Sequence, residues 1–158
     1  MVNLMAKRTA LFIVEGLSDE VKFVKKLLEK CNRNLDYKVF CYKTNIHVLA
    51  KELEDNYPDF DDEDEYIDFR LVLVGLADNE KDKNILSQNY NDIFLIFDFE
   101  PQEINPHFDV ISIMLKYFND STEHGKLYIN YPMMQSYKDF SYLPDDDFLD
   151  KKLYFNDG

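Results

Sequence analysis

Hydrophobic residues in this chain form short continuous runs, separated by longer stretches in which they recur at helical spacing. TALFIV at residues 9–14 and IFLIF at residues 93–97 have the β-branched and aromatic composition of buried strands. YKVFCY at residues 37–42 predicts another strand, and LYIN at residues 127–130 predicts one that Pro132 ends. The pattern therefore predicts four strands.

The first helix is predicted directly after the first strand. Ser18 is a suitable N-cap, and Asp19 and Glu20 suit the positive end of the helix dipole. One face of this helix is hydrophobic, comprising Val21, Val24, Leu27, Leu28 and Cys31. The other face carries a series of basic residues, comprising Lys22, Lys25, Lys26 and Arg33.

Three later segments complete the predicted elements. Thr44 or Asn45 caps a short helix whose inward positions are Ile46, Leu49 and Leu53. Residues 67–77 fit either a strand or a helix, and we interpret them as helix. A further amphipathic helix ends before Gly125 and presents Phe108, Ile111, Met114, Leu115 and Phe118.

Alternating strands and helices predict an α/β fold, with a central, mainly parallel four-stranded sheet and helices on both faces. The length of 158 residues fits one domain. We expect this three-layer, Rossmann-like domain to span residues 1–140, with an acidic insertion at about 54–68. Residues 141–158 then form an acidic, weakly packed tail.

The formal net charge of −13 is distributed unevenly. Residues 54–68 contain nine acidic residues and no basic one, whereas residues 1–53 carry a net charge of +4. An evenly spread acidic charge would argue against nucleic-acid binding, but here the first third is mildly basic. The acidic segment fits a solvated linker, a partner-binding or self-shielding segment, or part of a surface that imitates DNA.

Localisation follows from what the sequence lacks. No hydrophobic run reaches the 18 residues of a membrane span, and MVNLMAKRT is not a secretory signal. Cys31 and Cys41 do not form a metal-ligand cluster, and we interpret both as reduced, small core residues. We therefore expect a cytoplasmic protein that does not contact membranes.

Acidic residues follow two of the predicted strands at their carboxyl ends. Glu15 ends the first strand, and Asp98 and Glu100 follow the strand at 93–97. Strand alternation points Asp98 and Glu100 to the same face, and all three carboxylates converge if the two strands are neighbours. Clustered carboxylates repel unless a cation lies between them, and oxygen ligands of this kind suit Mg²⁺ or Mn²⁺.

The same residues resemble the motifs of the Toprim domain family. A hydrophobic strand followed by Glu15, Gly16 and Asp19 matches the first motif, and Asp98 with Glu100 matches the second, with glutamate in place of its last aspartate. VEGLSDEVKFVKKLL is most similar to the OLD-type nucleases, many of which serve in phage defence. The resemblance runs from about residue 9 to residue 130.

The resemblance implies a role for each matching residue. Glu15 is the general acid/base or metal-orienting glutamate, and Gly16 permits the sharp turn through which the substrate backbone approaches. Asp19 orients the site or binds a second metal ion. Asp98 is the principal metal ligand and Glu100 the second ligand, so Glu15, Asp98 and Glu100 form the expected catalytic set.

Structural explanations remain open for several of these positions. Glu15 and Gly16 also suit a strand-ending turn, and Asp19 also suits the first turn of a helix. Lys22 and Lys26 form either a solvated face or a stripe that tracks phosphates. Thr44 either caps a helix or receives a phosphate at the helix N-terminus.

Two functional hypotheses follow. The first is a metal-dependent nuclease that cleaves DNA or RNA in a bacterial or phage defence system, beside a protein partner such as an ATPase. A partner is expected because the acidic chain offers little basic surface of its own. The second is a non-catalytic Toprim-fold module that binds a protein through its acidic surface. A homo-oligomer is compatible with either hypothesis.

Overall fold

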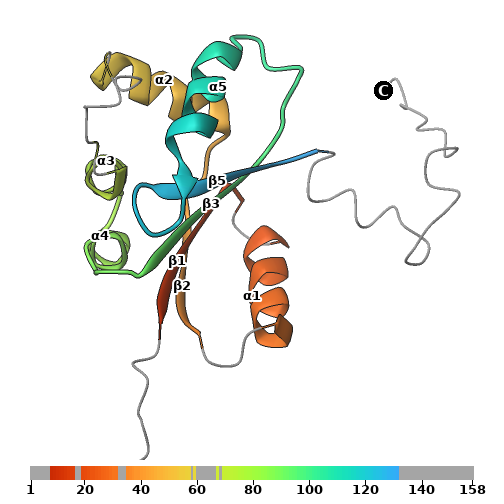
Figure 1. The fold of residues 1–158 in the computed structure, drawn as a ribbon. Helices are drawn as coiled ribbons and strands as arrows, with labels where there is room; N and C mark the ends of the chain where they lie inside the picture. The colour runs from red at the N-terminus through yellow and green to blue at the C-terminus, as the bar shows by residue number, and fades with distance from the viewer. Residues whose placement is uncertain are drawn as a thin grey trace, which may run out of the picture.

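The computed structural model describes residues 8–16, 19–31, 35–57, 59, 67 and 69–131 (Figure 1). The strands are β1 (Thr9–Val14), β2 (Asp36–Cys41), β3 (Asp92–Asp98), β4 (Asn119–Asp120) and β5 (Gly125–Asn130). The helices are α1 (Asp19–Cys31), α2 (Ile46–Asn56), α3 (Phe69–Leu76), α4 (Glu80–Leu86) and α5 (Phe108–Tyr117). Ser18, most of the acidic insertion and the predicted tail lie outside the described residues.

The sheet has five strands in the order β2-β1-β3-β5-β4. β2, β1, β3 and β5 are parallel, as the alternation of elements predicted. The expected number of four strands was wrong, because β4 adds a short antiparallel pairing with β5. A strand of two residues is too short to show a period of two, so the sequence pattern gave no signal for it.

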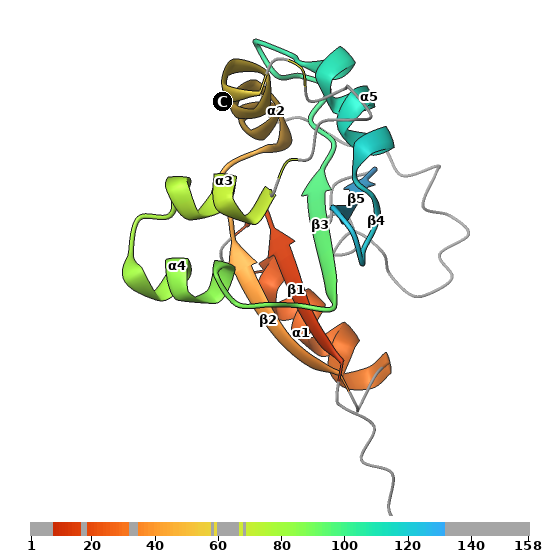
Figure 2. The same ribbon diagram turned by 60° about the vertical axis from the view of Figure 1, so that its left-hand side comes forward.

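The helices divide between the two faces of the sheet (Figures 1 and 2). On one face α1 packs through Val24 against alternate β1 residues, including Phe12 and Val14. On the other face α2, α3, α4 and α5 enclose the larger core around Leu11 and Ile13. Adjacent β1 residues therefore pack into different layers, which explains why this strand is hydrophobic without interruption.

The order of the strands changes direction between β1 and β3. The chain moves outward from β1 to β2 through α1, then returns past β1 to β3 and continues to β5. The helices of these oppositely directed crossovers lie on opposite faces, so the crossovers share one hand. The carboxyl ends of β1 and β3 therefore flank the switch point, where open α/β sheets place their ligands.

Two helices illustrate where the pattern was informative. The segment interpreted as helix at 67–77 is indeed helical over Phe69–Leu76. The pattern did not predict α4, because its sequence EKDKNIL is polar and among its residues only Leu86 is fully buried. Its N-cap is Asn79, whose side chain accepts a hydrogen bond from the backbone N–H of Asp82.

Three positions expected on inward helix faces are more exposed than predicted. Leu27 of α1 is 47% exposed, and Phe108 and Leu115 of α5 are 40% and 44% exposed. Among the hydrophobic residues of α1 whose burial the structure describes, only Val24 is buried, so that face is narrower than the spacing indicated. Among the described helices, none has the length and hydrophobicity required to span a bilayer.

Candidate acidic site at the carboxyl end of the sheet

The pairing of β1 with β3 brings Glu15 and Asp98 together. The two strands are parallel neighbours with Val14 opposite Ile96, which meets the condition set by the sequence. The backbone N–H of Asp98 donates to Glu15 Oε2 at 3.1 Å. The first carboxylate is therefore held directly against the end of the strand that carries the second.

Glu15 is a weaker acid than an ordinary glutamate. Burial raises its pKa from 4.5 to about 7, and the negative charges of Glu100, Asp98 and Glu20 add to this effect. The hydrogen bond from the Asp98 N–H opposes the shift without cancelling it. A carboxyl group with a pKa near 7 can both accept and release a proton at neutral pH, as general acid–base chemistry requires.

Asp98 is the most enclosed of the three predicted carboxylates. It is 7% exposed, and its Oδ1 accepts a hydrogen bond from Asn130 Nδ2 at 3.2 Å. Asn130 lies directly opposite Asp98 in the register of β3 and β5. The backbone N–H of Phe99 also donates to the Asn130 carbonyl at 2.9 Å, so the last residue of β5 fixes the end of β3.

Glu100 lies against the beginning of α2. The Asn45 side-chain amide donates to Glu100 Oε2 and to Glu103 Oε2, both at 2.9 Å. Strand alternation does not govern Glu100, because β3 already ends at Asp98. Asp98 and Glu100 accept hydrogen bonds from different residues, Asn130 and Asn45, and the charges of both act on Glu15.

A buried histidine fixes the backbone around Glu100. His47 is 2% exposed, and its Nε2 lies 3.1 Å from the Glu100 carbonyl oxygen. Its Nδ1 accepts a hydrogen bond from the backbone N–H of His107 at 3.1 Å. Because Nδ1 is the acceptor, Nε2 carries the proton and donates to Glu100. His47 thus binds both ends of the loop between β3 and α5.

The turn after β1 has a geometry that the sequence did not reveal. Among the described residues, positive φ angles occur only at Lys43 and Gly125, so Gly16 does not need a left-handed conformation. A Cβ on Gly16 would lie 2.0 Å from Glu20 Oε2. The atoms that a Cβ would meet all belong to the end of the Glu20 side chain, so a larger residue at position 16 would require that carboxylate to move.

The first turn of α1 adds an acid that the sequence analysis did not assign to the site. Glu20 is 8% exposed and its charge acts on Glu15. Asp19, which the Toprim motif designates, is half-buried at the first position of α1. Both carboxylates suited a first helical turn, so the sequence alone did not distinguish them.

The predicted substrate-binding residues lie on separate segments, with Gly16 in the turn after β1, Thr44 before α2, and both lysines on α1. Lys22 and Lys26 are exposed on α1. Thr44 is half-buried, and the cap of α2 is the adjacent Asn45, whose Oδ1 accepts from the Val48 N–H at 3.0 Å. The capping interpretation of this segment is therefore confirmed for Asn45.

The carboxylates suit Mg²⁺ chemically but do not form a closed ligand cage. Within the described part of the chain, no three His, Cys, Asp or Glu side chains lie together as a ready set of metal ligands. Mg²⁺ usually keeps several waters and needs only one or two protein carboxylates. The oxygen-only donors therefore fit an open, hydrated ion, which would also offset the charges of Glu100 and Asp98 that add to the effect of burial on the Glu15 pKa.

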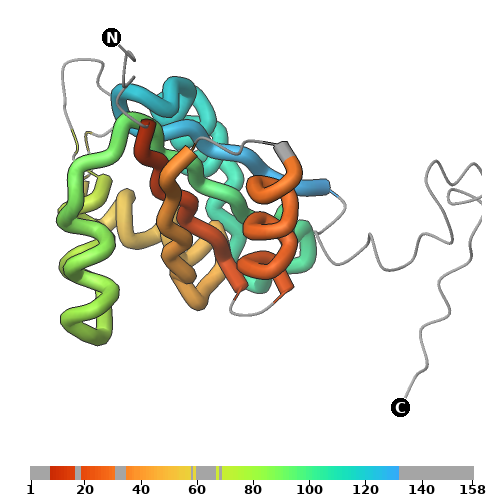
Figure 3. The backbone as a smooth tube through the Cα atoms, turned by 90° about the horizontal axis from the view of Figure 1, so that it is seen from below, coloured from red at the N-terminus to blue at the C-terminus, as the bar shows by residue number. Residues whose placement is uncertain are grey.

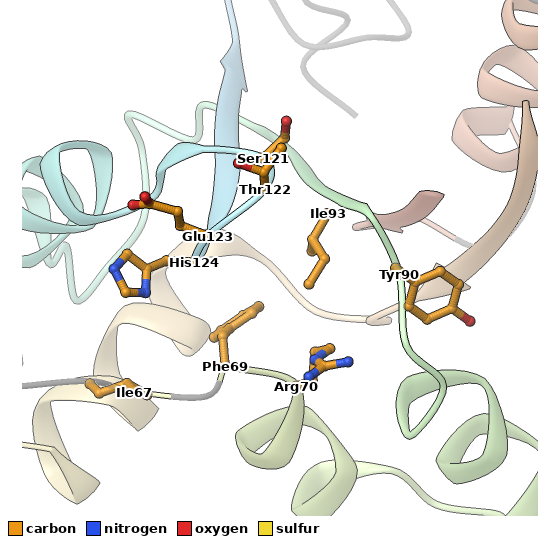
Figure 4. Close-up of a pocket in the computed structure, with 9 residues that line it drawn as sticks. All are labelled: Ile67, Phe69, Arg70, Tyr90, Ile93, Ser121, Thr122, Glu123 and His124. Carbon is orange, nitrogen blue, oxygen red and sulfur yellow. The ribbon is translucent and has the colours of Figure 1, made fainter. Parts of the chain in front are cut away.

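A separate cavity lies at the opposite end of the sheet (Figure 4). It has a volume of about 190 Å³ and is bordered by Ile93 near the beginning of β3 and by the turn at residues 121–124. Arg70 of α3 also lines it. Because Asp98 is at the other end of β3, this cavity is not part of the acidic site.

Three residues with structural roles at the site were not predicted: His47, Glu103 and Asn130. A buried histidine has no distinctive sequence spacing, and Asn130 was noted only as the end of a strand. The sequence did not show that the strand containing Asn130 pairs in parallel with β3.

Comparisons with protein-family models, curated proteins and solved structures give no match for this chain.

Proposed function

We propose that this protein is a Toprim-like nuclease that hydrolyses phosphodiester bonds of DNA or RNA with Mg²⁺ or Mn²⁺. The observation that carries the proposal is the contact between Glu15 and Asp98 at the switch point of the sheet. Glu15 combines this position with a pKa of about 7. A titratable carboxyl beside a second carboxylate is the arrangement that acid–base catalysis at a hydrated metal ion needs.

In this mechanism each carboxylate has a separate task. Asp98 and Glu100 would hold the ion, and Asn130 and Asn45 orient their carboxylates through hydrogen bonds. A bound ion would supply charge neutralisation at the phosphodiester and a lowered pKa of bound water. Glu15 takes a proton from the attacking water or gives one to the leaving oxygen, since its pKa permits both at neutral pH.

The proposed setting is a bacterial or phage defence system in the cytoplasm, with a protein partner such as an ATPase. The formal net charge of −13 supports the need for a partner, because nucleic-acid affinity depends strongly on basic contacts. A protein partner would supply additional basic surface, and a homo-oligomer is compatible with the same setting.

The test is a cleavage assay on plasmid DNA and on RNA with Mn²⁺. We expect Glu15→Gln and Asp98→Asn, which preserve side-chain shape, each to reduce the rate by about 10²–10⁴-fold. Glu29→Gln on the exposed part of α1 makes the same charge change and should retain full activity. Equal rates in all four proteins would refute the catalytic assignment.

A second candidate is a non-catalytic module that binds a protein through its acidic surface. The absence of a closed three-ligand set among the described residues favours it. Calorimetric titration with Mg²⁺ and with Mn²⁺ discriminates between the two candidates. Binding that disappears in Asp98→Asn supports the nuclease, whereas no heat of binding supports the interaction module.

A further inference from the structure

A basic groove runs along the free edge of the sheet. β2 is the outermost strand beside β1, and it lies between α1 and α4 (Figure 3). A cavity of about 650 Å³ follows this edge, and residues from all three elements line it. Three of these residues are lysines, one from each element: Lys25, Lys38 and Lys81.

The charge of the groove contrasts with that of the whole chain. None of the described residues that line the cavity is acidic, although the formal net charge is −13. Within the described part of the chain, the ion pairs of lysines involve Lys43, Lys51 and Lys83 rather than the groove lysines. Three ammonium groups from separate elements therefore share one concave surface whose described lining residues include no carboxylate, which favours an anionic ligand.

The other lining groups define the class of anion. Tyr37 is half-buried, and its ring packs edge-on against Phe12 with 6.3 Å between centroids. This contact holds the ring in place while part of it lines the cavity. Asn84 and Gln88 of the opposite wall add amide groups that can donate to and accept from base edges. Lysines beside an aromatic side chain are the combination with which proteins bind single-stranded nucleic acid.

The groove extends toward the amino end of β2. A cavity of about 40 Å³ shares Tyr37, Lys38 and Gln88 with it and adds Tyr90. Asp36 also lines this extension, so the anionic ligand is best accommodated toward the lysine-rich part. The concave surface is thus elongated along the strand, as a polymeric ligand requires.

The groove is also within reach of the acidic site. Lys25 is six residues after Asp19, which corresponds to about 9 Å along α1. Lys38 is three residues before Cys41, or about 10 Å along β2. The Cys41 thiol donates to the Gly16 carbonyl at 2.9 Å, so the carboxyl end of β2 adjoins the turn that carries Glu15.

We infer that the β2 groove binds single-stranded DNA or RNA and guides it to the acidic site. This inference rests on the proposed nuclease function for its direction, but the binding itself is independent of catalysis. A single strand is favoured over a duplex because a duplex keeps its base faces stacked inside and has none to offer Tyr37. Lys25, Lys38 and Lys81 contact phosphates, and Tyr37 stacks on a base.

The test measures fluorescence anisotropy of a labelled oligothymidylate of about 12 nucleotides, a length within the range that a small binding domain covers. EDTA is present throughout, so the result does not depend on metal binding or cleavage. The groove variant is Lys25→Ala/Lys38→Ala/Lys81→Ala. Its control, Lys51→Ala/Lys116→Ala/Lys126→Ala, makes the same change in net charge on α2, α5 and β5.

We expect the groove variant to raise the Kd about tenfold or more at ~0.1 M salt and the control to change it less than about threefold. The slope of log K against log salt should fall by about 2 in the groove variant, since each phosphate contact on a single strand contributes about 0.7. Tyr37→Leu, which keeps a hydrophobic contact with Phe12, should weaken binding about fivefold or more.

Three results would overturn the inference: no binding of the oligothymidylate, equal weakening in the groove and control variants, or tighter binding of a hairpin duplex. Binding of a labelled polyglutamate in its place would show that the groove accepts an acidic peptide instead. Groove binding without cleavage in the Mn²⁺ assay would refute the nuclease and leave the groove assignment standing. If the groove variant cleaves as fast as wild type and the oligonucleotide does not bind, the groove assignment is refuted and the nuclease proposal stands.

Discussion

Replacing Glu15 by glutamine should stabilise the protein at alkaline pH. The folded state raises the Glu15 pKa from 4.5 to about 7, mainly through burial. Between these two values the folded chain keeps a proton that the unfolded chain releases, so the free energy of unfolding decreases as the pH rises. Above pH 7 the loss is complete, and below pH 4.5 it is absent.

The magnitude follows from the pKa difference. Without screening by solvent, a pKa of about 7 in place of 4.5 corresponds to a loss of about 3.4 kcal/mol in the free energy of unfolding. Because Glu15 is only half-buried, solvent screens part of this energy, and we expect about 1.5 kcal/mol. Glu15→Gln removes the charge and keeps an oxygen for the Asp98 N–H, so it should recover this amount at pH 8.

The assay is urea denaturation of wild type and Glu15→Gln at pH 4.5, 6 and 8 in EDTA, followed by circular dichroism. The difference in unfolding free energy should grow from about zero to ~1.5 kcal/mol across this series. Glu29→Gln on exposed α1 surface provides the charge-matched control. A difference that stays constant with pH, or that favours wild type at pH 8, would refute the raised pKa.

Three further substitutions test the surroundings of the site. Asn45→Asp retains an N-cap but sets a carboxylate against Glu100. We expect calorimetry to show that the Mg²⁺ affinity falls about 10–100-fold, while the unfolding free energy changes by less than ~1 kcal/mol. His47→Leu leaves a part-buried carbonyl and a part-buried N–H without their His47 partner and should lower the urea-derived unfolding free energy by about 1–3 kcal/mol. Gly16→Ala should cost less than ~1 kcal/mol in the same measurement, because the group it displaces is the flexible end of Glu20; a larger loss would show that this carboxylate cannot move.

The strands at the centre of the sheet were predictable because their residues are hydrophobic on both faces. TALFIV and IFLIF lie at β1 and β3 within one residue of the predicted bounds, and both are covered by helices or strands that exclude water. Such burial requires a continuous hydrophobic run, which can be recognised without knowledge of the neighbours. α4 and β4 escaped prediction because each meets the core through very few side chains.

The site was predictable only in part, for a different reason. Glu15 and Asp98 follow the two most recognisable strands, so their positions could be inferred once those strands were assumed to be neighbours. The sequence did not indicate that Glu20, as well as the motif residue Asp19, would belong to the site. The hydrogen bond between Asn45 and Glu100 joins residues 55 positions apart. Local patterns predict where a strand ends, but they contain no information on which distant side chain meets it there.

Few other residues could make all the hydrogen bonds that Asn45 makes at position 45. Its oxygen closes the first turn of α2, while its NH₂ group reaches two carboxylates. Aspartate would offer no proton, and serine or threonine has a single hydroxyl hydrogen to share. Among the residues preferred at helix N-caps, only asparagine can accept one hydrogen bond and donate two. A substitution at position 45 chosen only to stabilise α2 would therefore remove the hydrogen bonds to Glu100 and Glu103.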